Sequence, residues 1–85
     1  MAEESVIISP VSSESSIALR EQANTLEFLV SRKATKGKVK REVEKRFNVK
    51  VEKVNVQNTL RGKRAFVKLA SEYKASELAT TLGML

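Results

Sequence analysis

The 85-residue sequence contains no cysteine and no histidine. Disulfides and thiolate metal sites are therefore excluded, and zinc or iron has almost no side chains to bind, so we expect no metalloenzyme and no cofactor. Long apolar runs are also missing, since stretches such as "VII" at residues 6–8 are far too short to span a bilayer. The acidic first residues do not resemble a signal sequence. We expect a cytoplasmic protein without membrane insertion.

Positive charge is concentrated in the middle of the chain. The net charge is +6, but residues 28–71 hold fourteen bases and three acids, a net charge of +11, whereas residues 1–27 carry −4 and residues 72–85 carry −1. Two windows, residues 28–41 and 53–71, contain no acid and hold eleven of the sixteen bases. This segregation is typical of a nucleic-acid-binding protein.

Residue periodicity predicts one domain with a modest core, built from short strands and helices. We expect strands at about residues 6–9, 26–30, 51–57 and 64–69, and helices at about residues 13–22, 36–47 and 74–82. Residues 1–5 are expected to form a flexible acidic N-terminus, with the single domain covering residues 6–85. The order of elements predicts an α+β fold: a mostly antiparallel four-stranded sheet with about three helices packed on one face.

Individual residues predict three further details of these elements. Thr35 can cap the second helix, whose apolar residues recur at every fourth position up to Phe47. In the next strand the apolar phase slips after Val51, which predicts a bulge. Gly62, at the tip of the hairpin that follows, can adopt a positive φ angle.

The run "RKATKGKVKR" at residues 32–41 holds six bases and no acid. It could be the solvated side of an amphipathic helix, partly balanced by later glutamates. However, Lys36 and Lys38 fall in the first helical turn, where the partial positive charge of the helix disfavours cations, and Gly37 costs about 1 kcal/mol of helix propensity. A phosphate bound to the free amides of this turn explains all three residues together.

A second basic cluster lies at the predicted hairpin tip, with Arg61, Lys63 and Arg64. It could be an ordinary solubilising turn. The next strand, however, alternates Arg64, Phe66 and Lys68 on its outer side, where an aromatic ring between cations could stack on a base. Phe66 could equally belong to the core if that side of the sheet is covered.

Catalysis has no candidate residues in this sequence. Without histidine or cysteine, no paired spacing suggests a nucleophile with its base or a general acid and base, and no glycine-rich phosphate loop is present. We therefore expect a protein that is not an enzyme and has no small-molecule substrate.

Several linked stretches resemble one known family. The segments "SPVSSES", "ATKGKVKREVEKRFNVKVEKVNV" and "KRAFVKLA" are similar to the L23 family of large-subunit ribosomal proteins, which lies at the exit of the peptide tunnel; the similarity runs from about residue 8 to residue 85. The short hairpin at residues 59–63 and the absence of a basic N-terminal arm resemble the archaeal type.

The resemblance implies a structural constituent of the large subunit that binds domain III of its rRNA near the tunnel exit, beside neighbouring ribosomal proteins. It also implies a docking surface for signal recognition particle, nascent-chain chaperones and the translocon, with Glu14 in the place of a family glutamate used for docking. The alternative is a small protein-interaction domain whose basic face binds an acidic partner. The predicted rRNA-binding residues are Arg32, Lys33, Lys36, Lys38, Lys40, Asn55, Arg61, Lys63, Arg64 and Lys68.

Overall fold

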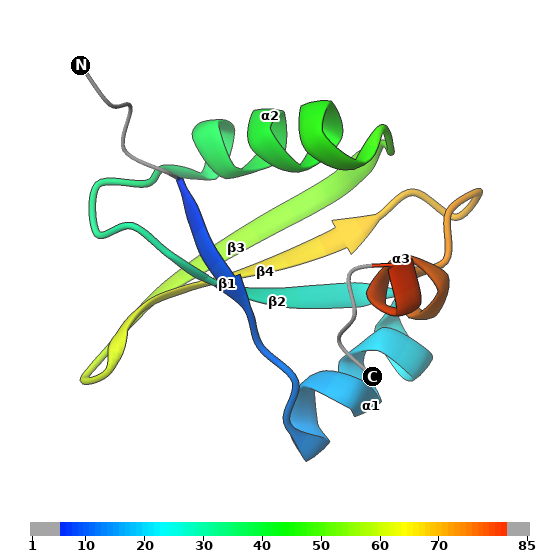
Figure 1. Ribbon diagram of the computed structural model, residues 1–85, viewed down its shortest axis with the longest axis horizontal. Coiled ribbons are helices and arrows are strands. Elements are labelled where there is room, and N and C mark those ends of the chain that lie inside the picture. The colour runs from blue at the N-terminus through cyan, green and yellow to red at the C-terminus, as the bar shows by residue number, and fades with distance from the viewer. Residues whose placement is uncertain (1–5, 82–85) are drawn as a thin grey trace.

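A computed structural model describes residues 6–81 and contains four strands and three helices (Figure 1). In chain order they are β1 (Ile7–Pro10), α1 (Glu14–Ala23), β2 (Thr25–Val30), α2 (Lys36–Phe47), β3 (Val51–Thr59), β4 (Gly62–Leu69) and α3 (Ala75–Thr81). The strands form one antiparallel sheet in the order β1-β2-β4-β3. The predicted α+β fold is confirmed. The predicted N-terminal segment 1–5 and the expected end of the last helix, at residue 82, lie outside the described residues.

The core lies between α2 and one face of the sheet. Alternate residues of β2 and β4 point to this face, among them Leu26, Phe28 and Val67, which are all buried. Val39 and Val43 of α2 pack against them and are 0 % exposed. The ring of Phe47 stacks on Phe28 with a centroid distance of 6.2 Å. The predicted apolar stripe of this helix is therefore its buried side.

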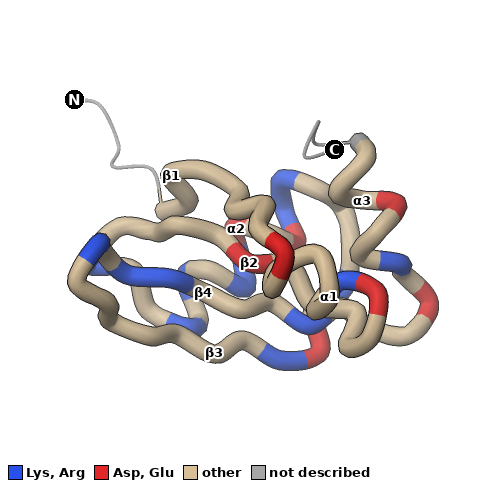
Figure 2. The backbone as a smooth tube through the Cα atoms, turned by 90° about the horizontal axis from the view of Figure 1, so that it is seen from below, with Lys and Arg blue, Asp and Glu red and all other residues tan. Residues whose placement is uncertain are grey.

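The helices are not all on one face, which differs from the expected arrangement. α2 lies above the sheet, whereas α1 lies below it and α3 lies beside the end of β2 (Figures 1 and 2). Leu19 of α1 borders a hollow with Phe66, whose side chain points away from α2. The physical reason is the composition of α1, whose buried residues are Ser16 and Arg20. Only α2 has an apolar stripe long enough to cover the apolar face of the sheet.

Asn24 connects α1 to the segment that leads into α3. It ends α1 in the left-handed conformation, with a φ of 51°. Its Nδ2 donates hydrogen bonds to the carbonyl oxygens of Leu69, Ala70 and Tyr73 at 3.3, 3.4 and 2.7 Å, and its Oδ1 accepts one from Ala75 N at 2.7 Å. The partners of Asn24 are 45 to 51 residues away in the chain, so local sequence does not indicate this anchor.

Two predicted irregularities of the sheet are confirmed. The register between β3 and β4 shifts between Val51 and Lys53, as expected for a bulge. Gly62, which begins β4, has a φ of 132°, a conformation that other residues rarely adopt. Among the described residues, no helix is long and apolar enough to cross a membrane.

Candidate nucleic-acid interface

The start of α2 is open to solvent and positively charged. Thr35 caps the helix as predicted, its Oγ1 accepting a hydrogen bond from Lys38 N at 3.3 Å. Lys36, Lys38 and Lys40 are exposed, and the first turn contains no acid. A Cβ atom at Gly37 would meet nothing within 4 Å, so no packing against the protein requires a glycine there. The backbone of this turn is accessible to a ligand.

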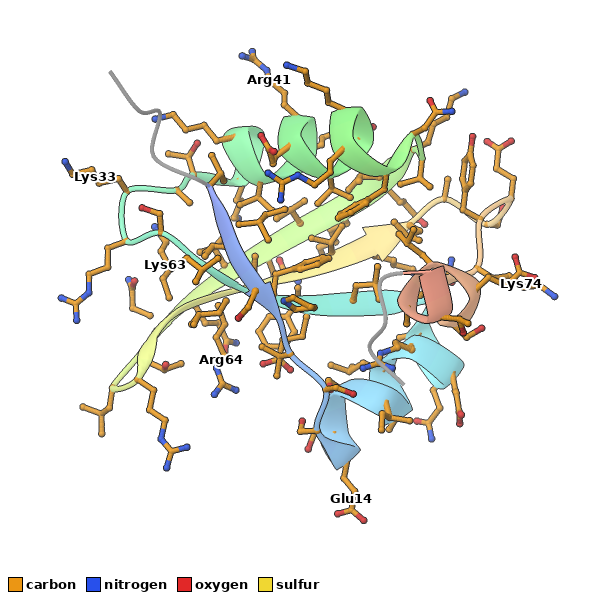
Figure 3. All side chains as sticks on the ribbon, in the orientation of Figure 1. Glu14, Lys33, Arg41, Lys63, Arg64 and Lys74 are labelled. Carbon is orange, nitrogen blue, oxygen red and sulfur yellow. The ribbon has the colours of Figure 1, made fainter. Side chains whose placement is uncertain are left out.

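Lys63 joins the hairpin to the turn that precedes α2. Its Nζ donates a hydrogen bond to the carbonyl oxygen of Ala34 at 2.6 Å and another to that of Arg32 at 3.4 Å. Lys33 and Lys63 consequently lie at the same end of the molecule (Figure 3). The two basic clusters that are separate in the sequence thus form one surface, which we call the basic end. Its members are Arg32, Lys33, Lys36, Lys38, Arg61 and Lys63.

The hairpin tip extends this basic end. Arg61 is exposed and follows Leu60, whose side chain is fully exposed. Thr59 Oγ1 donates a hydrogen bond to the carbonyl oxygen of Gly62 at 2.6 Å and closes the turn. The tip and the loop before α2 lie at the same end of the molecule (Figure 1). Arg61 therefore lies at the same end of the molecule as the start of α2.

Arg64 has a partner that the sequence did not reveal. Its Nη1 lies 2.9 Å from Glu27 Oε2, and the Glu27 side chain is only 4 % exposed whereas that of Arg64 is 33 % exposed. Arg64 therefore forms an ion pair with a buried carboxylate within the protein, and its charge is already compensated there. Glu27 stands at the outward position of an alternating strand, but only the register of β2 with β4 brings these two residues together.

Asn55 and Lys68 lie on the other face of the sheet, the one turned away from α2. In the register of β3 with β4, Asn55 is opposite Phe66, and Lys68 is opposite Lys53. Gln57 shares this face, two residues beyond Asn55. Lys53 and Gln57 were not among the predicted site residues. Strict alternation from Lys53 onward, once the bulge is allowed for, would have placed both beside Asn55.

Glu14 lies apart from the basic end. It is the first residue of α1, after a reciprocal cap in which Ser13 and Ser16 exchange hydrogen bonds between side chain and backbone. Its side chain is exposed and projects away from the sheet, on the opposite side of the molecule from Arg41 of α2 (Figure 3). The predicted docking residue and the predicted RNA-binding residues thus occupy different surfaces.

The sequence is similar to known ribosomal proteins. The model of the family described as ribosomal protein L23 matches residues 5–77. The chain belongs to the ribosomal protein L23 family. It is 48 % identical over 79 residues to the large ribosomal subunit protein uL23 of Thermoplasma acidophilum, covering 93 % of this chain and 94 % of that protein. It is 47 % identical over 78 residues to the protein of the same name from Picrophilus torridus, covering 92 % and 95 %.

Membership of the L23 family confirms the resemblance, including its archaeal type, since both of these relatives are archaeal. The chain is a ribosomal protein of the large subunit, bound to ribosomes in the cytoplasm, where it contacts rRNA and neighbouring ribosomal proteins. Proteins of this family are structural components of the ribosome and are not enzymes.

Proposed function

We propose that residues 6–85 form a single rRNA-binding domain that binds domain III of the large-subunit rRNA near the peptide tunnel exit, with the basic end as its main contact. The observation that carries the proposal is the pair of hydrogen bonds from Lys63 to Ala34 and Arg32, because they unite the two acid-free windows of the sequence in one surface.

The chemistry of the basic end suits RNA phosphates. Its lysines and arginines are exposed, with the exception of the half-buried Lys63, and they surround a helix start whose amides can bind an anion. Exposed lysines and arginines neutralise phosphates without contacting base edges, so the protein would recognise mainly the shape of a folded RNA. Lys40, one turn further along α2, extends the same surface.

We further propose that the side of the molecule around Glu14 is a docking surface for signal recognition particle, nascent-chain chaperones and the translocon. The support is geometric: Glu14 is exposed on α1, away from the basic end, and would stay accessible while the basic end is covered by rRNA. Charge reversal by Glu14→Lys should lower the affinity of ribosomes for these factors without lowering incorporation of the protein into subunits.

Filter binding of the full chain to a domain III rRNA fragment at several salt concentrations tests the RNA interface. The wild type should lose affinity steeply as salt rises, because binding to phosphates releases counterions. The double variant Lys36→Glu/Lys38→Glu should bind more weakly, and its salt slope should fall by about 1 for each phosphate that the protein no longer neutralises. Lys45→Glu, in the last turn of α2, serves as a control for charge reversal.

The outcomes separate RNA binding from the alternative of an acidic protein partner. A flat salt response of the wild type would contradict the proposal. A double variant that binds rRNA less tightly and also fails to enter large subunits supports it. If the same variant assembled into subunits as well as Lys45→Glu does, the basic end would instead serve an acidic protein.

A further inference from the structure

The sheet face turned away from α2 carries an ordered set of polar and aromatic side chains. Its central strand, β4, places Phe66 between Arg64 and Lys68, each two residues away along the strand. The edge strand β3 places Asn55 directly opposite Phe66, and Gln57 opposite Arg64. An aromatic ring thus lies beside two amides on the neighbouring strand.

This part of the face is open. α1 lies below β2 and leaves β3 and β4 uncovered (Figure 2). Between α1 and β3 is a hollow of about 440 Å³. It is bordered by Phe66 of β4, by Asn55 and Gln57 of β3, and by Leu19 of α1. The side-chain amides of Asn55 and Gln57 are exposed and make no hydrogen bond within the described part of the chain. Their donors and acceptors are available to a ligand in the hollow.

The charge around the hollow is positive. Lys53 and Lys68 stand directly opposite each other on β3 and β4, and both are exposed. Like charges at opposed positions destabilise a sheet, and neither lysine forms an ion pair within residues 6–81. The third cation, Arg64, is already paired with Glu27. The two lysines therefore offer uncompensated charge to an anionic ligand.

We propose that Phe66, Asn55 and Gln57 form a seat for one unpaired RNA base, with Lys53 and Lys68 binding its adjacent phosphates. The base stacks on Phe66, and the two amides hydrogen-bond to its edge. The base must be unpaired, because a base within a helix exposes neither its face nor its pairing edge. The inference rests on the proposed rRNA binding and adds to it a base contact on a second face.

The composition of the face favours RNA over a protein partner. The centre of a protein–protein interface is depleted in lysine and is usually built around several apolar anchors. Here the hollow presents one aromatic ring, two amides and the half-buried Leu19, and two lysines lie next along the strands. Three large apolar side chains of the described residues are exposed, and none of them borders the hollow: Ile8 lies on β1, Leu60 at the hairpin tip, and Ile17 on α1 beside Arg20 and Ser76.

Two kinds of footprint on large-subunit rRNA, bound by the full-length protein, test the seat. Hydroxyl-radical cleavage reports protection of the backbone, which the proposed function requires. Chemical modification of unpaired bases with dimethyl sulfate and carbodiimide reports protection of single bases, which the seat requires. We expect the wild type to protect at least one unpaired base within its backbone footprint.

Substitutions of the seat residues then test whether they are what protects that base. Phe66→Leu keeps an apolar side chain but removes the ring, and should restore modification of the base and weaken binding by about five-fold or more. Asn55→Ala removes only exposed atoms and should raise modification of the same base. Phe66→Tyr keeps the ring and should keep the protection, and Ile8→Ala, which shortens an exposed apolar side chain on β1, should change neither footprint.

The results distinguish failure of the seat from failure of the proposed function. A backbone footprint that includes no protected unpaired base, or protection that survives both Phe66→Leu and Asn55→Ala, would overturn the seat and leave rRNA binding intact. Absence of any backbone footprint would overturn both. Thermal unfolding of each variant shows whether it is folded. If Phe66→Leu is unfolded, the footprint of Asn55→Ala alone tests the seat.

Discussion

The Nζ atom of Lys63 lies 2.6 Å from the carbonyl oxygen of Ala34, and this hydrogen bond, with a longer one to Arg32, joins the β4 end of the hairpin to the turn before α2. The consequence is that a lysine predicted to bind RNA also shapes the protein. By holding the turn in place, Lys63 sets where Arg32 and Lys33 can point. The bond thus ties the stability of the domain to the form of its basic end.

Replacing Lys63 with methionine tests its structural role. Lys63→Met keeps the aliphatic stem but removes the donor, leaving the Ala34 carbonyl without this partner, so the free energy of unfolding should fall by about 1 to 2 kcal/mol. Urea denaturation measures the decrease. Lys68→Met is the matched control, since Lys68 is exposed and makes no hydrogen bond within the described residues, and should change stability by less than about 0.5 kcal/mol. Equal effects of the two variants would contradict a structural role for Lys63.

The Arg64–Glu27 pair should be a sensitive point of the fold. Arg64→Met leaves the buried carboxylate of Glu27 without its cation, and we expect a loss of about 3 kcal/mol, the low end for buried pairs because Arg64 is one-third exposed. Glu27→Gln should cost less, and the double variant should recover part of the stability. A double-mutant cycle by urea denaturation measures the coupling. Strict additivity of the two substitutions would show that the pair contributes nothing specific.

The two asparagines that end helices offer a direct test of the Asn24 anchor. Asn24 and Asn48 share the left-handed conformation, with φ angles of 51° and 54°. Glycine tolerates this conformation, so Asn24→Gly should lose only the side-chain hydrogen bonds to the loop before α3 and destabilise the domain by about 2 to 3 kcal/mol. Asn48→Gly should be neutral within about 0.5 kcal/mol, since no side-chain hydrogen bond joins Asn48 to the described residues. Thermal unfolding compares them, and similar losses at both sites would contradict the anchor.

Charge reversal at the start of α2 should separate stability from RNA binding. Lys36→Glu places an anion at the helix N-terminus and opposite Lys40, four residues on, so the domain should gain about 0.5 to 1 kcal/mol while its affinity for rRNA falls. Lys45→Glu, in the last turn, opposes the helix dipole but lies four residues after Arg41, with which it can pair, so stability should change by less than about 0.5 kcal/mol and rRNA affinity should stay unchanged. Denaturation and filter binding on the same preparations check this. If Lys36→Glu lowered both the stability of the domain and its affinity for rRNA, Lys36 would have a structural role.

The local structure was largely predictable because it depends on residues close together in the chain. The cap at Thr35, the stripe ending at Phe47 and the positive φ of Gly62 each follow from the chemistry of a few neighbouring residues, and each is confirmed. The position of α1 was not predictable in the same way. Its polar inner residues, Ser16 and Arg20, gave no indication of which face of the sheet it would lie on.

By itself, then, the sequence determined the order of strands and helices, the segregation of charge and, through linked motifs, the family. Only the tertiary structure decided which charged residues meet. Lys63 and Ala34 are 29 residues apart in the chain, and Arg64 and Glu27 are 37 apart. Their contacts depend on the register in which β4 pairs with β2, and that register results from burial of the whole apolar face against α2. No short stretch of residues contains that information, because it arises only when distant strands pack together.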